Sequence, residues 1–216
     1  MNRVANLPTI AIFGATGRTG RHVLEQATAA GHAVRVLARR AGALELHPEQ
    51  ATVVTGNVLD PAAVAETIRG ADVVVSVFGH VKGSPPTLQA DGTQIIVNAM
   101  AHEGISRIIS LSGGGLPAPQ DEPKVADRLI RFLLRRLSPH VLDDAIAHLE
   151  VLRASGLDWT VVRGPRLTDN APLGTYRVGW VGVNASTQIA RGDLARFILT
   201  QVADRGFVHQ LPFVSR

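Results

Sequence analysis

The residues best suited to chemistry form a glycine-rich run near the N-terminus, Gly14-Ala15-Thr16-Gly17-Arg18-Thr19-Gly20. The run directly follows an apolar, strand-like segment at 9–13 and opens a stretch with helical character. Glycine permits a tight turn, a close approach of the backbone to a pyrophosphate, and close packing of a helix on a strand. The free N–H groups at the start of the helix then face the phosphates. We therefore expect a dinucleotide site here, the alternative being a glycine-rich turn without a ligand.

The end of the next strand-like segment, at 33–38, discriminates between the two nicotinamide dinucleotides. NAD-specific sites place an Asp or Glu there, which binds the ribose 2′-hydroxyl. This strand instead ends in Arg39-Arg40, and no acidic residue follows before Glu45. A guanidinium pair suits a 2′-phosphate, to which Arg18 could add a third contact. We therefore expect NADP(H) in preference to NAD(H); the alternative is that Arg39 and Arg40 cap a surface turn.

The segments that position these residues alternate between strand-like and helical patterns. Strands are expected at 9–13, 33–38, 51–55, 72–77, 107–111 and 159–163, and a last candidate strand lies at 206–214. Helices are expected at 17–30, 60–69, 87–103, 125–137, 141–154 and 193–202. Parallel strands need crossover connections, and right-handed crossovers build a doubly wound sheet. The predicted fold is therefore α/β, a Rossmann-type parallel sheet in a single domain over 1–216.

Two parts of the chain are expected to shape the substrate side. Residues 164–216 supply small C-terminal elements, and residues 113–138 form a variable loop or lid that ends in an amphipathic helix. One side of this helix is arginine-rich, which indicates either a solvated face or a lid that carries cations. Its apolar positions are Leu129, Ile130, Leu133, Leu134 and Leu137, opposite Arg128, Arg131 and Arg135.

Composition and charge exclude several classes of protein. The 216 residues contain no cysteine, which excludes disulfides, thiolate nucleophiles and cysteine metal sites. No apolar run approaches the roughly 18 residues of a membrane span, and the N-terminal residues show no secretory signal, so a cytoplasmic protein is expected. The net charge of +4 comes from scattered arginines, without the basic tract typical of nucleic-acid binding. Arginine suits small anionic ligands instead.

The glycine run resembles the dinucleotide loop of the atypical short-chain dehydrogenase/reductase superfamily. Within it, the chain resembles the NmrA-like NAD(P)H-binding proteins, and more narrowly the biliverdin-IXβ reductase/flavin reductase group. The resemblance covers residues 9–205 and continues in the family's order through SGLDWTVVR at 155–163, PRLTD at 165–169, GTY at 174–176 and DLA at 193–195.

The resemblance implies a set of cofactor-binding residues. The loop would bind the pyrophosphate through Gly14, Thr16, Gly17, Arg18, Thr19 and Gly20. Arg39 and Arg40 would meet the 2′-phosphate, and Asn57 and Val58 would lie beside the adenine, Asn57 standing where the family usually has Asp. The nicotinamide half would be contacted by Phe78, Gly79, Ser110, Leu111, Pro165 and Leu167.

The proton donor of ordinary short-chain dehydrogenases is missing from the sequence. That donor is the Tyr of a Tyr-x-x-x-Lys pair, whereas the single tyrosine, Tyr176, is followed four residues later by Trp180. A carbonyl dehydrogenase or a sugar epimerase needs such a donor, so both activities are disfavoured. Hydride transfer to a flavin, quinone or bilin requires only that two rings are bound and aligned, because the proton can come from solvent.

Two positions depart from the biliverdin/flavin reductase group. Its Ser after the fifth strand falls on Gly113, with Ser112 just before, and its active-site His falls on Arg166. These departures argue against bilin as the acceptor. We take Ser112 and Arg166 as the candidate catalytic residues, with Arg166 holding an anionic group of the acceptor beside the nicotinamide.

Two functions remain open from the sequence. The first is an NADPH-dependent oxidoreductase that transfers hydride to a small, conjugated, anionic acceptor such as a flavin or quinone. The second is a non-catalytic NADP(H)-binding redox sensor of NmrA-like type, which the missing dyad also favours. The protein is expected to act as a monomer or homodimer, without metal, membrane or nucleic acid.

The remaining polar residues have simpler interpretations. Asp143 and Asp144 are interpreted as charges at a helix N-terminus. His148 is expected on the surface of the same helix, and none of the histidines has the spacing of a metal site.

Overall fold

The computed structural model of the chain describes residues 7–40, 42, 44 and 51–216. Glu45 therefore lies outside the described residues, as do the side chains of Ile130, Arg131, Leu134 and Leu137. Eight strands form one sheet in the order β3-β2-β1-β4-β5-β6-β10-β8. They are β1 (Ile10–Phe13), β2 (Val34–Ala38), β3 (Ala51–Thr55), β4 (Val73–Ser76), β5 (Arg107–Gly113), β6 (Asp158–Gly164), β8 (Arg177–Gly179) and β10 (Phe213–Ser215).

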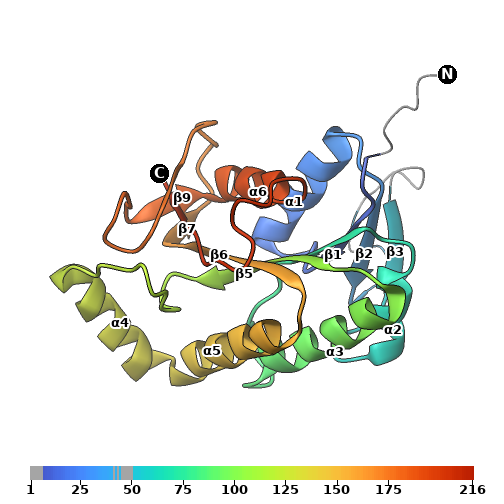
Figure 1. Ribbon diagram of the computed structural model, residues 1–216, viewed down its shortest axis with the longest axis horizontal. Coiled ribbons are helices and arrows are strands. Elements are labelled where there is room, and N and C mark those ends of the chain that lie inside the picture. Colours follow the sequence, from blue (N-terminus) through green and yellow to red (C-terminus); the bar gives the residue numbers. More distant parts are fainter. Residues whose placement is uncertain (1–6, 41, 43, 45–50) are drawn as a thin grey trace.

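Helices cover both faces of this sheet. In Figure 1, α1 and α6 lie on one face, while α2, α3 and α5 lie on the other. The helices are α1 (Arg18–Ala29), α2 (Pro61–Ile68), α3 (Leu88–Glu103), α4 (Val125–Leu137), α5 (Pro139–Ala154) and α6 (Arg191–Thr200). The first six strands pair in parallel, in the order 3-2-1-4-5-6 of a Rossmann fold. The predicted fold class is confirmed.

Strand periodicity divides the interior into two cores. Successive side chains of a strand point to opposite faces of its sheet. Ile10 and Ile12 accordingly pack with α1 and α6, whereas Ala11 and Phe13 pack with α2, α3 and α5. Since all four residues are buried, the sheet is covered on both faces.

Local contacts and glycines define several helix ends. The carboxylate of Asp60 accepts a hydrogen bond of 3.0 Å from the N–H of Ala62, which caps α2 ahead of its N1 proline. Gly31 follows α1 with a φ of +89°, and Gly104 ends α3 with a φ of +71°. Only glycine adopts such φ values without strain, so it can follow the last helical turn.

The C-terminal part differs from expectation. A second, two-stranded parallel sheet joins β7 (Arg166–Thr168) and β9 (Gln188–Ala190), and the sequence pattern did not indicate it. The predicted strand at 206–214 is wrong over most of its length, because only Phe213–Ser215 forms β10. His209 has a positive φ of 60° and Pro212 lacks an N–H donor, and both features interrupt an extended strand.

A buried ion pair fixes the loop that follows β5. Arg163 of β6 is fully buried and donates two hydrogen bonds of 2.8 Å to the carboxylate of Asp121. The same guanidinium donates to the carbonyl oxygens of Leu116 and Leu211. Burial raises the pKa of Asp121, but the Arg163 guanidinium and two backbone N–H donors together hold that pKa below its usual range. The first half of the predicted lid is thus anchored to the sheet.

The predicted amphipathic helix forms as α4, which extends away from the rest of the molecule in Figure 1. Leu129 and Leu133 on its apolar side are both exposed. Among the described helices, including α4, none has both the length and the apolar character needed to cross a membrane.

Candidate functional site

Two neighbouring cavities open at the carboxyl ends of the parallel strands. The first, the glycine-loop cleft, has a volume of about 400 Å³ and extends from the ends of β2 and β3 to the loop after β4. This edge of a doubly wound sheet is where such folds bind ligands. Eight of the predicted cofactor residues line it: Gly14, Thr16, Gly17, Arg39, Asn57, Val58, Phe78 and Gly79.

Each of the three loop glycines is needed for a different structural reason. Gly14 has a φ of +91°, and a Cβ there would lie 2.6 Å from the backbone nitrogen of Phe78. A Cβ on Gly20 would lie only 2.0 Å from the carbonyl oxygen of Gly14. Gly17 precedes α1 without any side-chain cap, which leaves the first N–H groups of the helix free for a ligand. These are the three roles expected of a dinucleotide loop.

The side chain of Arg18 does not line the cleft in which the 2′-phosphate contact was expected. Its guanidinium pairs with the carboxylate of Asp169, which also accepts a hydrogen bond of 2.5 Å from Arg191. The Arg18 and Arg191 guanidinium groups hold the pKa of Asp169 below its usual range. Arg18 thereby connects the start of α1 to the segment after β7, instead of lining the glycine-loop cleft.

The predicted adenine end contains one arginine and one amide. Arg39 is exposed and lines the cleft, whereas Arg40 is exposed but does not line it. The Oδ1 of Asn57 accepts a hydrogen bond of 3.1 Å from the N–H of Leu59. An amide oxygen has two lone pairs, so this atom can still accept a hydrogen bond from an adenine amino group.

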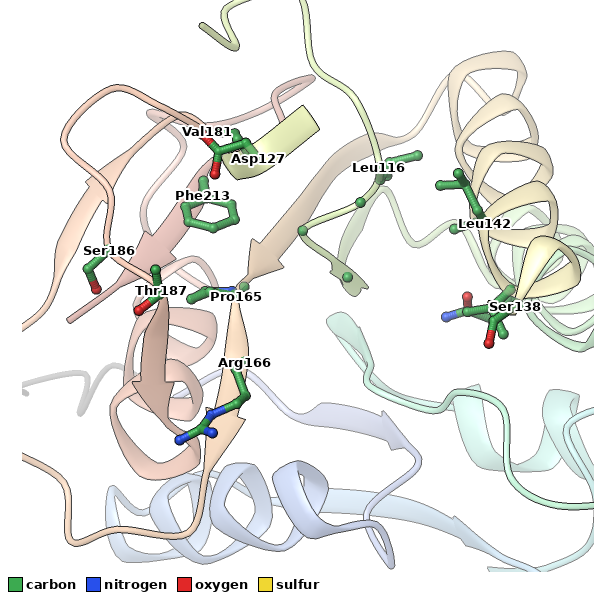
Figure 2. Close-up of a pocket in the computed structure, with 17 residues that line it drawn as sticks. Leu116, Asp127, Ser138, Leu142, Pro165, Arg166, Val181, Ser186, Thr187 and Phe213 are labelled. Atoms are coloured by element: carbon green, nitrogen blue, oxygen red, sulfur yellow. The ribbon is translucent and has the colours of Figure 1, made fainter. Parts of the chain in front are cut away.

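The second cavity, the apolar pocket, has a volume of about 460 Å³ (Figure 2). Leu142 and Ser138 lie on one side of it, and Phe213 and Val181 lie on the opposite side. The candidate site residues Pro165 and Arg166 line this pocket, together with Gly113–Leu116, Gln89, Asp127, Val141, Ala145, Gly164, Ser186 and Thr187. The exposed Arg166 side chain also lies 3.4 Å from the Oε1 of Gln188.

Other predicted residues lie inside the structure instead of lining either cavity. Ser112 is buried, and its Oγ has no hydrogen-bond partner among the described residues. Ser110 is buried as well, while Leu111 and Leu167 pack against the core on the α1 and α6 side. Thr19 and Gly20 are buried within α1.

Two expectations for α5 are wrong. His148 is 1% exposed instead of lying on the surface, and its Nε2 forms a hydrogen bond of 2.9 Å with the Oγ of Ser110. Burial lowers the pKa of His148 to about 4, although the charge of Asp144 acts in the opposite direction. Asp144 is also buried, and its carboxylate accepts hydrogen bonds from the N–H groups of Gln89 and Ala90. It therefore caps α3 instead of acting as a charge on its own helix.

One residue of the cleft was missed by sequence reasoning. His80 follows β4, lines the glycine-loop cleft, and donates a hydrogen bond of 2.6 Å from Nε2 to Asp144 Oδ2. The available signal was its position in the sequence, directly after Gly79, which was predicted to contact the dinucleotide. Among the described residues, no cluster of three or more His, Asp or Glu side chains is arranged to hold a metal ion.

Part of the chain is similar in sequence to known bacterial proteins. The chain is 33% identical over 108 residues to an uncharacterized protein of Mycobacterium tuberculosis, covering 50% of this chain and 12% of that protein. It is 32% identical over 154 residues to a (4-alkanoyl-5-oxo-2,5-dihydrofuran-3-yl)methyl phosphate reductase of Streptomyces griseus, covering 71% of this chain. The chain spans 46% of the length of that reductase.

Solved structures share the fold at low sequence identity. A short-chain dehydrogenase/reductase of Veillonella parvula in complex with NADP has a TM-score of 0.79 and 21% identity, with 97% of this chain and 94% of that one covered. ChuY, an anaerobilin reductase of Escherichia coli O157:H7, has a TM-score of 0.79 and 20% identity, with 97% of both chains covered.

A family signature covers most of the chain, including the glycine loop. The pattern of the NAD(P)H-binding family matches residues 14–205, beginning at the first glycine of the loop. The loop sterics, the free start of α1 and the sheet order agree with this match. The chain therefore belongs to the NAD(P)H-binding family.

Proposed function

We propose that this protein is an NADPH-dependent oxidoreductase that transfers hydride to a flavin, quinone or similar conjugated acceptor bound in the apolar pocket. The observation that carries the proposal is the second cavity of about 460 Å³ beside the glycine-loop cleft. Gln89 connects the two cavities, since it lines the apolar pocket and its Nε2 donates to the carbonyl oxygen of Phe78 in the cleft. The reductases among the similar proteins support the same class of reaction.

The residues of the cleft fit a bound dinucleotide. The loop glycines and the free N–H groups of α1 would hold the pyrophosphate, and Arg39 would pair with the 2′-phosphate of NADPH. When bound, the reduced nicotinamide supplies the hydride. The 2′-phosphate is where NADPH differs from NADH, so we assign the choice of cofactor to Arg39.

The apolar pocket suits a flat, conjugated acceptor. Its opposite sides present Leu142 and Phe213, which can enclose a ring system and exclude water. Arg166 supplies a positive charge for a phosphate or carboxylate of the acceptor. Ser112 is buried and does not line this pocket, so the proposal gives it no part as an exposed proton donor.

The second candidate function is a non-catalytic sensor that binds NADP(H). The observation that favours it is the burial of Ser112 together with the absence of a Tyr-x-x-x-Lys pair. A sensor requires different affinities for the oxidised and reduced cofactor, because a ligand shifts an equilibrium only through differential binding.

The test is anaerobic mixing of the protein with NADPH and excess FMN, followed through the loss of flavin absorbance, with NADH in parallel. Rapid bleaching with NADPH is expected, and Arg39→Asp should reduce it at least tenfold by placing a carboxylate near the 2′-phosphate. Arg166→Gln should raise the KM for FMN without changing NADPH affinity. Arg153→Asp, on the far end of α5, is the matched charge change and should keep the wild-type rate.

Two results contradict the proposal in different ways. Tight NADPH binding without bleaching of FMN, and without reduction of quinones, would contradict the oxidoreductase proposal and favour the sensor. Equal rates with NADPH and NADH, unchanged in Arg39→Asp, would refute the assigned role of Arg39.

A further inference from the structure

A histidine–carboxylate pair joins the glycine-loop cleft to the helix beneath it. His80 lies in the loop after β4, and its side chain is 17% exposed where it lines the cleft. Its Nε2 donates to Oδ2 of Asp144, whose side chain is fully buried in α5. The two residues are 64 positions apart in sequence, so the fold alone brings them together.

Asp144 holds this imidazole in one orientation. Its Oδ2 also accepts from the N–H of Gln89 at 2.7 Å, and its Oδ1 accepts from the N–H of Ala90 at 2.9 Å. A carboxylate fixed by two backbone donors cannot rotate to follow the histidine, so the histidine is fixed by the carboxylate. Because Nε2 carries the proton given to Asp144, the other ring nitrogen, Nδ1, is the group available to a ligand. Nδ1 has no hydrogen-bond partner in the described part of the chain.

The position of His80 separates it from the adenine end of the cleft. Arg39 follows β2, whereas His80 follows β4 and contacts α5. In the sheet order β3-β2-β1-β4-β5, these two residues therefore lie on opposite sides of β1 and its glycine loop. A dinucleotide centred on that loop would place its 2′-phosphate half near Arg39 and its other half near His80.

We propose that His80 is a cofactor-binding residue, oriented by Asp144, whose Nδ1 contacts a ribose or phosphate oxygen in the nicotinamide half of the bound dinucleotide. This anchor is independent of Arg39. It rests on the binding of NAD(P)H and not on hydride transfer, so it holds for a reductase and for a sensor alike. Asp144 is a positioning residue, since it reaches the ligand only through His80.

The experiment compares two ligands by calorimetry. NADP⁺ contains both halves of the cofactor, whereas adenosine 2′,5′-bisphosphate contains only the half near Arg39. We expect His80→Gln to weaken NADP⁺ binding about tenfold and to leave the bisphosphate within twofold of wild type. The glutamine amide can still donate to Asp144, whereas Nδ1, the ring nitrogen without a hydrogen-bond partner among the described residues, is removed. Asp144→Asn should weaken NADP⁺ in the same selective way, but less.

Controls distinguish a lost contact from a disturbed fold. Arg39→Ala should weaken both ligands, because both carry the 2′-phosphate. His102→Gln, an exposed change at the last turn of α3, should weaken neither. Equal weakening of both ligands by His80→Gln would show a structural role and overturn the proposal, as would unchanged NADP⁺ affinity. His80→Asn gives a second variant: it retains a polar group near Nδ1 and should bind NADP⁺ more tightly than His80→Gln. Absence of turnover with FMN would contradict only the reductase, because the binding difference is measured without an acceptor.

Discussion

Acid sensitivity of the fold should originate at His148. Burial lowers the pKa of this imidazole from 6.5 to about 4 in the folded protein, despite the nearby Asp144. Below pH 6.5 the unfolded chain therefore takes up a proton that the folded chain refuses, and the free energy of unfolding decreases as the pH falls toward 4. The two pKa values correspond to a loss of about 2 kcal/mol between pH 7 and pH 5, approaching about 3 kcal/mol at pH 4.

Urea denaturation at pH 7 and pH 5, followed by tryptophan fluorescence, measures this loss. The His148→Gln variant has no titrating group at this position, and its amide can bond to Ser110 as the imidazole does. Its difference in unfolding free energy between the two pH values should be smaller than that of the wild type by about 2 kcal/mol. His102→Gln removes an exposed imidazole and should keep the wild-type difference. The reasoning fails if His148→Gln and the wild type lose equal stability, whatever their stabilities at pH 7.

Further substitutions probe the glycine loop and the buried ion pair. Gly20→Ala places a methyl group 2.0 Å from the carbonyl oxygen of Gly14 and should lower the unfolding free energy by about 1–3 kcal/mol. Gly113→Ala meets no atom within 4 Å and should stay within about 0.5 kcal/mol of wild type in the same urea titration. Asp121→Asn leaves the Arg163 charge buried without its carboxylate and should cost about 3 kcal/mol or more, whereas adding Arg163→Gln should recover part of that loss. A loss below 1 kcal/mol for Asp121→Asn would contradict the interpretation of this pair as a buried charge.

Local sterics explain which features were predictable from the sequence. A turn with a φ of +91° at Gly14 and a contact that excludes a Cβ at Gly20 can be built only with glycine, so the residue types reveal the loop. The same holds for Asp60, whose capping contact lies two residues away along the chain. The turn and the helix cap are formed by residues close together in sequence, so their residue types and spacing predict them.

The errors concern partners that are distant in sequence. His148 lies on the same side of α5 as the buried Ala145, Leu149 and Leu152, and this spacing was the signal for burial. Its polarity suggested the surface instead, because Ser110, which partners it, is 38 residues away. For Arg163, at the end of an apolar strand, no partner was predicted from the sequence. Its carboxylate partner lies 42 residues earlier, in a loop that has no regular pattern.

The link between Arg163 and Asp121 also constrains how related sequences can diverge. Either residue changed alone leaves one charge inside the protein, so the route from this pair to an apolar pair passes through a poorly folded intermediate. The backbone conformation from Gly113 to Asp121 should therefore be retained in related proteins even where the surrounding sequence differs. The exposed positions of α4 carry no such requirement. Substitutions in relatives of this protein are thus expected to accumulate first along α4, which borders the apolar pocket through Asp127 and where changes at exposed positions leave the fold intact.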